Sequence, residues 1–210
     1  MSTAAAALRY RRDGFAVVPG VMDAAAVAAC IEHLHHLQAR DHPPGPIATG
    51  LLGSDRVLAG IADDPRLATI ARCILDADPL AFGCTYLVKE PRRGLPVLWH
   101  QDGHPWRTRF GITEAVTLWV PLDPTGEANG GLRVIPGSHA LAAQPLRPSL
   151  EEPSVFGAEI DPALVDATLA RQLTLAPGDV VAHHPDLIHG SLPNRSEHLR
   201  RALAIRYRPA

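Results

Sequence analysis

Two histidines and one aspartate of this chain have side chains of the kind that bind a divalent transition metal. His100 and Asp102 stand two residues apart, and His189 lies far downstream in the segment His189-Gly190-Ser191. Two imidazoles and one carboxylate can occupy one face of an Fe(II) ion and leave its other coordination positions open. Such a centre could bind an organic acid, a substrate and dioxygen, so these residues predict iron-dependent oxygenase chemistry.

The spacing of His100 and Asp102 suits a single strand. Side chains at positions i and i+2 of a strand point to the same face, so the two residues could share one metal ion. The third ligand must then come from a neighbouring strand, and the segment 173–191 has the composition to supply one. By itself the pair is a weak signal, because a histidine beside an aspartate is more often simply solvated.

An arginine follows the distal histidine by 11 residues. Arg200 opens the apolar run 202–207, which is typical of a strand. A guanidinium at the mouth of a barrel strand could hold a carboxylate through two hydrogen bonds, and deprotonation does not remove its charge. A 2-oxoglutarate cosubstrate requires a contact of this kind.

With these segments in view, the chain resembles the phytanoyl-CoA dioxygenase family of Fe(II)/2-oxoglutarate-dependent oxygenases. The matching segments follow the family's order over nearly the whole chain, and together they are far more specific than any one of them. They are residues 13–20 (DGFAVVPG), 99–102 (WHQD), 135–139 (IPGSH), 177–180 (PGDV) and 189–191 (HGS), with Asn194, Ser196 and Arg200 after them.

The resemblance implies a role for each of five residues. It assigns His100, Asp102 and His189 to iron, Arg200 to the distal carboxylate of 2-oxoglutarate, and Ser191 to a second contact with that carboxylate.

Arg201 is the rival for the arginine's role. The spacing from His189 favours Arg200. Strand alternation would also place Ala202 and Ala204 on the same inward face as Arg200, where small side chains leave room for a cosubstrate. Arg201 would then share the outward face with the apolar positions 203, 205 and 207.

The resemblance further implies a reaction. The expected enzyme hydroxylates an unactivated C–H bond of a small metabolite, consumes 2-oxoglutarate and dioxygen, and releases succinate and CO2, and ascorbate would support its activity. Related halogenases replace the carboxylate ligand with a small residue, whereas Asp102 is present here, so hydroxylation is the first prediction. Desaturation and ring formation stay open.

The ectoine hydroxylase branch of the family is the nearer resemblance. The chain shares with it the run Val88-Lys89-Glu90 and an aromatic residue, Trp106, four positions after the aspartate. In that branch the aromatic residue faces substrate, so Trp106 and the nearby His104 are candidate substrate contacts. The branch's amide-bearing cosubstrate contacts are replaced here by Gly83 and Leu87, which argues against ectoine itself as the substrate.

Two other classes remain as alternatives. The same three ligands could hold zinc or another divalent metal in an enzyme on a related barrel. A family member that has lost catalysis could instead bind 2-oxoglutarate or a metabolite. Activity restored by Fe(II) but not Zn(II), and binding of 2-oxoglutarate, would separate these alternatives from an oxygenase.

Composition is consistent with one enzyme domain over residues 1–210. The 20 basic and 22 acidic residues give a net charge of −2, and no basic run is long enough to follow a phosphate backbone. No apolar stretch approaches the length of a membrane span, and the three cysteines are too scattered for a disulfide framework. We therefore expect a cytoplasmic enzyme with a small-molecule substrate and no nucleic-acid or membrane partner, as a monomer or a homodimer.

Periodicity predicts a mostly β fold with flanking α-helices, a double-stranded β-helix (jelly roll, cupin-like). Apolar positions at helical spacing predict helices from Asp23 to Gln38 and from Asp64 to about residue 74. Alternating or apolar runs between turn-forming residues predict strands, and many short strands favour a jelly roll. These strands are 80–88, 97–102, 115–121, 132–135, 171–175, 179–183 and 202–208.

The remaining segments and histidines receive simpler interpretations. Residues 42–53 and 138–161 are rich in turn formers, and either segment could cover the site or simply connect strands. His33, His35 and His36 are expected on a solvated helix face, and His139 in a turn. His183 and His184 could compete with His189 for the metal, but neither is followed by Gly-Ser.

Overall fold

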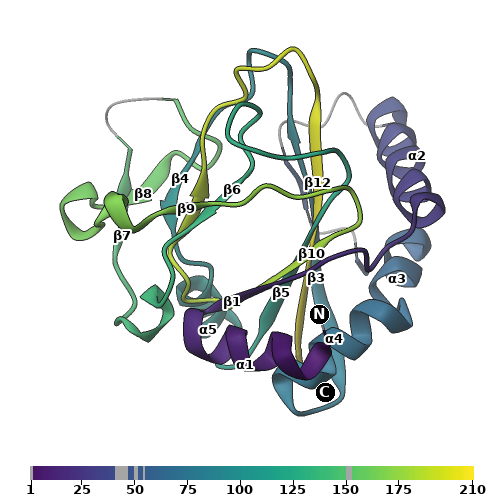
Figure 1. Cartoon of the computed structure of the whole chain (residues 1–210), viewed down its shortest axis with the longest axis horizontal. Coiled ribbons are helices and arrows are strands. Elements are labelled where there is room, and N and C mark those ends of the chain that lie inside the picture. The colour runs from purple at the N-terminus through teal and green to yellow at the C-terminus, as the bar shows by residue number, and fades with distance from the viewer. Residues whose placement is uncertain (1, 41–46, 50–51, 54, 150–152) are drawn as a thin grey trace.

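Two antiparallel sheets form the centre of the fold. The computed structural model describes residues 2–40, 47–49, 52–53, 55–149 and 153–210. The larger sheet has the order β1-β10-β5-β12-β3-β2 and the smaller one the order β4-β11-β6-β9, while β7 and β8 form a separate pair (Figure 1). The strands are β1 (Phe15–Val18), β2 (Ile47–Thr49), β3 (Pro79–Lys89), β4 (Val97–His100), β5 (Val116–Pro121), β6 (Leu132–Val134), β7 (Leu146–Pro148), β8 (Ala158–Ile160), β9 (Arg171–Gln172), β10 (Val180–His183), β11 (His189–Ser191) and β12 (Arg200–Pro209).

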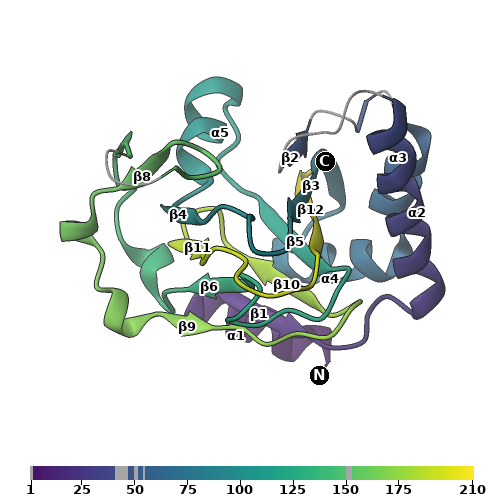
Figure 2. The ribbon, with the colours of Figure 1, turned by 90° about the horizontal axis from the view of Figure 1, so that it is seen from above.

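Helices cover the outer face of the larger sheet. Figure 2 shows α2, α3 and α4 on the side of this sheet that faces away from β4, β11 and β6. The helices are α1 (Thr3–Asp13), α2 (Ala24–Arg40), α3 (Arg56–Ala62), α4 (Pro65–Leu75) and α5 (Gly103–Phe110). The predicted helices at 23–38 and 64–74 are confirmed as α2 and α4, the second with the Asp64 carboxylate capping the Arg66 N–H. Among the described residues, no helix is long and apolar enough to span a membrane.

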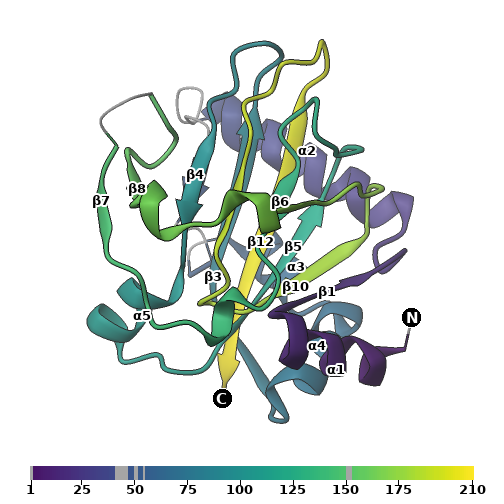
Figure 3. The ribbon, with the colours of Figure 1, turned by 60° about the vertical axis from the view of Figure 1, so that its left-hand side comes forward.

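The alternation of β12 separates two apolar cores. β12 pairs with β3 on one edge and with β5 on the other, and it runs through the middle of the molecule (Figure 3). Ala202 and Ala204 pack between the two sheets, whereas Leu203, Ile205 and Tyr207 pack beneath the helices. The alternation predicted for this strand is confirmed, and its small residues leave space on the inner side.

The jelly-roll architecture is confirmed, but three local predictions are wrong. The strand expected at 171–175 ends at Gln172, as β9. The strand expected at 97–102 ends at His100, because residues 103–110 form α5 and Asp102 lies in the turn between them with helical dihedrals. His33 is not on a solvated helix face. Its side chain is buried between the Asp55 carboxylate, 2.7 Å from Nε2, and the Tyr86 hydroxyl, 3.1 Å from Nδ1.

Residues 42–53 and 138–161 were predicted as segments that could cover the site. The structure describes only part of the first and most of the second. Of the segment 42–53, residues 42–46, 50 and 51 lie outside the described residues, and 47–49 form β2. The segment 138–161 carries the hairpin of β7 and β8. It also brings Phe156 to the pocket described below, so part of it does cover that pocket.

Candidate metal centre and cosubstrate pocket

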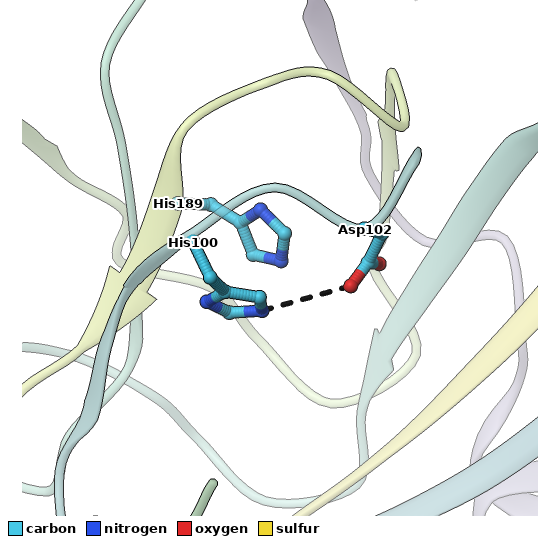
Figure 4. A group of neighbouring side chains, drawn as sticks. All are labelled: His100, Asp102 and His189. Atoms are coloured by element: carbon cyan, nitrogen blue, oxygen red, sulfur yellow. Dashed lines mark ion pairs between the residues drawn. The ribbon is translucent and has the colours of Figure 1, made fainter. Parts of the chain in front are cut away.

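The three predicted ligands meet in the space between the two sheets. One ligand atom from each of His100, Asp102 and His189 lies within 4.8 Å of the others. Figure 4 shows the three side chains pointing toward one another. The Nε2 of His100 is 3.6 Å from the Oδ1 of Asp102, and the two imidazole centroids are 4.1 Å apart. His100 and His189 face each other because they are register partners on β4 and β11.

Both imidazoles are held in the tautomer that leaves the lone pair of Nε2 free. The Nδ1 of His100 lies 2.9 Å from the Leu98 carbonyl oxygen, and the Nδ1 of His189 lies 2.9 Å from the Leu187 carbonyl oxygen. A carbonyl only accepts hydrogen bonds, so Nδ1 carries the proton in each ring and Nε2 is left as the metal-binding atom. A hydrogen bond of this kind orients most metal-binding histidines.

Asp102 is positioned by a turn rather than by strand alternation. The N–H groups of Asp102 and Gly103 both donate to the Pro185 carbonyl, at 2.8 and 2.9 Å. Pro185 belongs to the segment that leads into His189. The two metal-binding segments, more than eighty residues apart in sequence, are therefore joined directly through the backbone.

Side chains around the centre reinforce this connection. Arg107 on α5 forms a two-pronged ion pair with Asp186, with N···O distances of 2.9 and 2.8 Å. Gln101 points away from the metal ligands and donates to the Asp186 carbonyl at 2.7 Å. Gly190 allows β11 to approach β4, because a Cβ there would lie 2.7 Å from the Val97 carbonyl oxygen.

Burial and neighbouring charges keep all three ligands in their metal-binding protonation states. Burial, with smaller contributions from neighbouring imidazoles, lowers the pKa of His100 and of His189 to about 4. Burial acts against the Asp102 carboxylate. His189 and His100, which are protonated at the low pH where Asp102 titrates, act with Arg206 to outweigh burial and lower the pKa of Asp102 to about 2. At neutral pH the site therefore offers two neutral imidazoles and one carboxylate.

These shifts predict that the metal-free protein loses stability as the pH falls from about 6.5 toward 4. In the fold the pKa values of His100, His183 and His189 are all lowered to about 4. An imidazole of the unfolded chain titrates near 6.5, so the unfolded chain binds more protons in this window. The free energy of unfolding is therefore highest above the imidazole pKa of the unfolded chain. By pH 4, protonation of each imidazole lowers it by about 3 kcal/mol.

Urea unfolding of EDTA-treated protein at several pH values measures this slope. His183→Phe removes one buried imidazole without removing a predicted ligand, so the slope should fall by at least a third, because His183 also contributes to the lowered pKa of His189. A free energy of unfolding that stays constant from pH 7 to pH 5 would contradict the prediction.

Arg200 and Ser191 lie in the same pocket as the three ligands. The pocket is lined by Leu87, Val97, His100, Asp102, Thr117, Trp119, Gly130, Leu132, Phe156, His183, His189, Gly190, Ser191, Arg200, Ala204 and Arg206. Arg201 faces the opposite side of β12, where its guanidinium binds the Asp123 carboxylate at 2.9 and 2.7 Å. Arg200 therefore faces the pocket and Arg201 faces away from it, as strand alternation predicted.

Several buried polar atoms of this pocket have no hydrogen-bond partner among the described residues. They are Nε of Arg200, Oγ1 of Thr117 and Nδ1 of His183. An unpaired polar group in a protein interior is costly unless a ligand or water satisfies it. Burial lowers the pKa of Arg200 to about 10, which still leaves it a cation at neutral pH. The pocket thus fits a bound metal together with an acidic cosubstrate.

The other histidines and the predicted substrate contacts have different positions. The His183 ring lies 4.6 Å from that of His189, centroid to centroid, but His183 is not part of the cluster of three ligands. His184 accepts a hydrogen bond from the Asp186 N–H. His104 is exposed on α5 and is not among the described lining residues, so the geometry gives no support for its predicted role. Trp106 is buried behind the Arg206 guanidinium, 5.7 Å from ring centroid to Cζ.

Arg206 and Phe156 are two of the lining residues that the sequence analysis did not single out. Arg206 occupies the inward face of β12 six residues after Arg200, and the alternation of this strand could have identified it. Phe156 sets its ring edge-on to His100, with centroids 5.2 Å apart. No local pattern marks Phe156, because it reaches the site only through the long segment that folds over it.

Comparisons with known proteins identify similar sequences and a similar solved structure. L-proline trans-4-hydroxylase from Streptomyces griseoviridis is 29% identical over an alignment 227 positions long, which covers 96% of this chain and 85% of that protein. Ectoine dioxygenase from Bordetella parapertussis is 31% identical over 146 residues, 62% of this chain, and the match spans about half (47%) of that relative. The solved structure of the epimerase SnoN, in complex with Fe3+, alpha ketoglutarate and nogalamycin RO, is similar with a TM-score of 0.77 at 25% identity. That match covers 99% of this chain and 84% of SnoN.

The family assignment rests on a match to a family model. A model of the phytanoyl-CoA dioxygenase family matches residues 10–202, which include every predicted metal ligand and Arg200. The chain therefore belongs to the phytanoyl-CoA dioxygenase family.

Proposed function

We propose that this protein hydroxylates an unactivated C–H bond of a small metabolite, with His100, Asp102 and His189 as the iron ligands and Arg200 and Ser191 as the cosubstrate contacts. The class is that of its relatives, the Fe(II)- and 2-oxoglutarate-dependent dioxygenases. When bound, Fe(II) and 2-oxoglutarate supply an oxidant made from dioxygen, with release of succinate and CO2.

One observation carries the assignment of roles. The buried Arg200 guanidinium lines the same pocket as the three metal ligands, and its Nε has no partner among the described residues. A carboxylate satisfies a guanidinium through charge-assisted hydrogen bonds, which are among the strongest in proteins. A dicarboxylate whose other end binds the metal would satisfy both features at once.

The pocket walls support chemistry that must exclude water. Trp119, Leu132 and Val97 contribute apolar side chains, and Phe156 covers His100 from the segment that carries β7 and β8. Protection of a reactive centre from solvent is a main task of the protein in cofactor enzymes.

The relatives indicate the size of the substrate but not its identity. Two of them are named for hydroxylation of L-proline and for oxidation of ectoine, both small molecules. Gly83 and Leu87 provide no amide side chains at the positions where the ectoine branch uses them. We therefore propose a small metabolite other than ectoine, with desaturation and ring closure as alternative outcomes of the same centre.

Succinate formation tests the proposal. Purified protein is incubated in air with 2-oxoglutarate, Fe(II) and ascorbate, and in parallel with Zn(II) in place of Fe(II). We expect slow succinate release with Fe(II) alone and acceleration when the substrate is present.

The alternatives give different results. Activity with Zn(II) would indicate another kind of metal enzyme, and failure to bind 2-oxoglutarate in a calorimetric titration would indicate a binding protein that has lost the cosubstrate. Binding without turnover would mean that the substrate is required as a trigger.

Three broader features also remain proposals. We propose that residues 1–210 form a single Fe(II)/2-oxoglutarate dioxygenase domain, that it acts in the cytoplasm, and that it is a monomer or a homodimer without nucleic-acid or membrane partners. Its three free cysteines and its net charge of −2 support this proposal.

A further inference from the structure

A second arginine of β12 lines the pocket and has no assigned role. Arg206 lies on the same inward face as Arg200, with Ala202 and Ala204 between them. Six residues of strand separate the two Cα atoms by about 20 Å. The two guanidinium groups therefore serve different ends of the pocket, and a cosubstrate held by Arg200 leaves Arg206 available.

The Arg206 side chain is fixed by its neighbours. Its Nη1 donates to the Thr85 hydroxyl at 2.7 Å, and its Cζ lies 5.7 Å from the centroid of the Trp106 ring. The Trp106 ring is held in turn by an edge contact with Phe82, at 5.3 Å between centroids. Across the ladder the register partner of Arg206 is Gly83, which leaves room for the arginine stem.

The charge of Arg206 is not neutralised by the protein. Within the described residues no carboxylate lies within ion-pair distance of Arg206, and the bond to Thr85 is the one side-chain hydrogen bond found for it. The other arginines near the pocket differ, since Arg107 is paired with Asp186 and Arg201 with Asp123.

We propose that Arg206 binds a carboxylate of the primary substrate, so that the enzyme acts on small carboxylic acids. This inference rests on the proposed function. An oriented guanidinium with free N–H groups matches the geometry of a carboxylate, and the aromatic face behind it restricts its motion. A carboxylate at Arg206 would direct the rest of the substrate toward the iron ligands.

Paired probes test the proposal by direct binding. Anaerobic protein loaded with Fe(II) and 2-oxoglutarate is titrated calorimetrically with L-proline and L-prolinamide, and with acetate and acetamide. Within each pair the carboxylate is replaced by a group of similar shape without negative charge. We expect each acid to bind the wild type about ten- to a hundredfold more tightly than its amide, the range for hydrogen bonds to charged groups.

Three variants test whether Arg206 causes the tighter binding of acids than of amides. Arg206→Gln should abolish it, and Arg206→Lys should retain part of it because the charge remains. Arg208→Gln is the matched control, since Arg208 is the next inward-facing residue of β12 but does not line the pocket; it should behave as the wild type does. Unchanged thermal unfolding would show that each variant is folded.

The outcomes separate this inference from the proposed function. Equal binding of acids and amides by the wild type, or a preference that survives Arg206→Gln, would overturn the role of Arg206 while 2-oxoglutarate binding stays intact. Loss of 2-oxoglutarate binding in the wild type would instead refute the proposed function. The acid and amide titrations, repeated without 2-oxoglutarate, would still decide whether Arg206 binds carboxylates.

Discussion

Asp102→Ala is expected to abolish Fe(II) binding and 2-oxoglutarate turnover. The Asp102 carboxylate is the one anionic ligand of the proposed centre, and the two imidazoles beside it are neutral at pH 7 because burial lowers their pKa values to about 4. Without the carboxylate, a divalent ion would face two neutral ligands in a site where Arg206 also contributes positive charge. The loss should exceed the roughly hundredfold effect of removing a group that only orients a metal ligand.

Metal titration and turnover assays measure this effect. EDTA-treated protein is titrated with Fe(II) under argon, and succinate formation is followed separately in air. Asp166→Asn provides a control, because this exposed carboxylate lies outside the pocket and its removal changes the net charge by the same amount. Wild-type Fe(II) affinity in Asp102→Ala would show that the metal is held elsewhere.

Arg200→Met is expected to prevent 2-oxoglutarate binding and to leave the ligand-free protein as stable as before or more stable. The guanidinium is buried and its Nε has no partner among the described residues, so the fold carries an unsatisfied charge when the cosubstrate is absent. Replacement of a buried charge by an apolar side chain of similar length is often neutral or stabilising. Loss of two charge-assisted hydrogen bonds should weaken 2-oxoglutarate binding by about a hundredfold or more.

Arg201→Met is the matched control for this experiment. Arg201 is adjacent in sequence but is paired with Asp123 on the other face of the sheet, so its replacement breaks an ion pair and leaves a carboxylate behind. We expect Arg201→Met to lower stability and to leave the dissociation constant of 2-oxoglutarate nearly unchanged. Calorimetric titration and thermal unfolding of both variants measure the two effects. The reverse pattern would mean that Arg201 is the cosubstrate arginine.

The sequence by itself determined the chemistry and the class of fold. The residue types at 100, 102 and 189 define a ligand set, and the motifs in family order over residues 13–200 identify the family that the comparisons then showed. Two helices could also be predicted, because their apolar periodicity and the cap at Asp64 are local properties. Strand alternation on β12 correctly placed the small residues Ala202 and Ala204 on the inner face.

Only the tertiary structure decided which residues meet at the site. Asp102 reaches the metal position through a turn fixed by the Pro185 carbonyl, a contact between distant segments that strand periodicity does not contain. His33 is buried because Asp55 and Tyr86, from other elements, satisfy its ring nitrogens. The arrival of Phe156 over His100 and the unpaired state of Arg206 likewise depend on long-range packing. Local sequence sets which way a side chain points on its own element, whereas the pairing of β4 with β11 and of β12 with β3 and β5 sets what it faces.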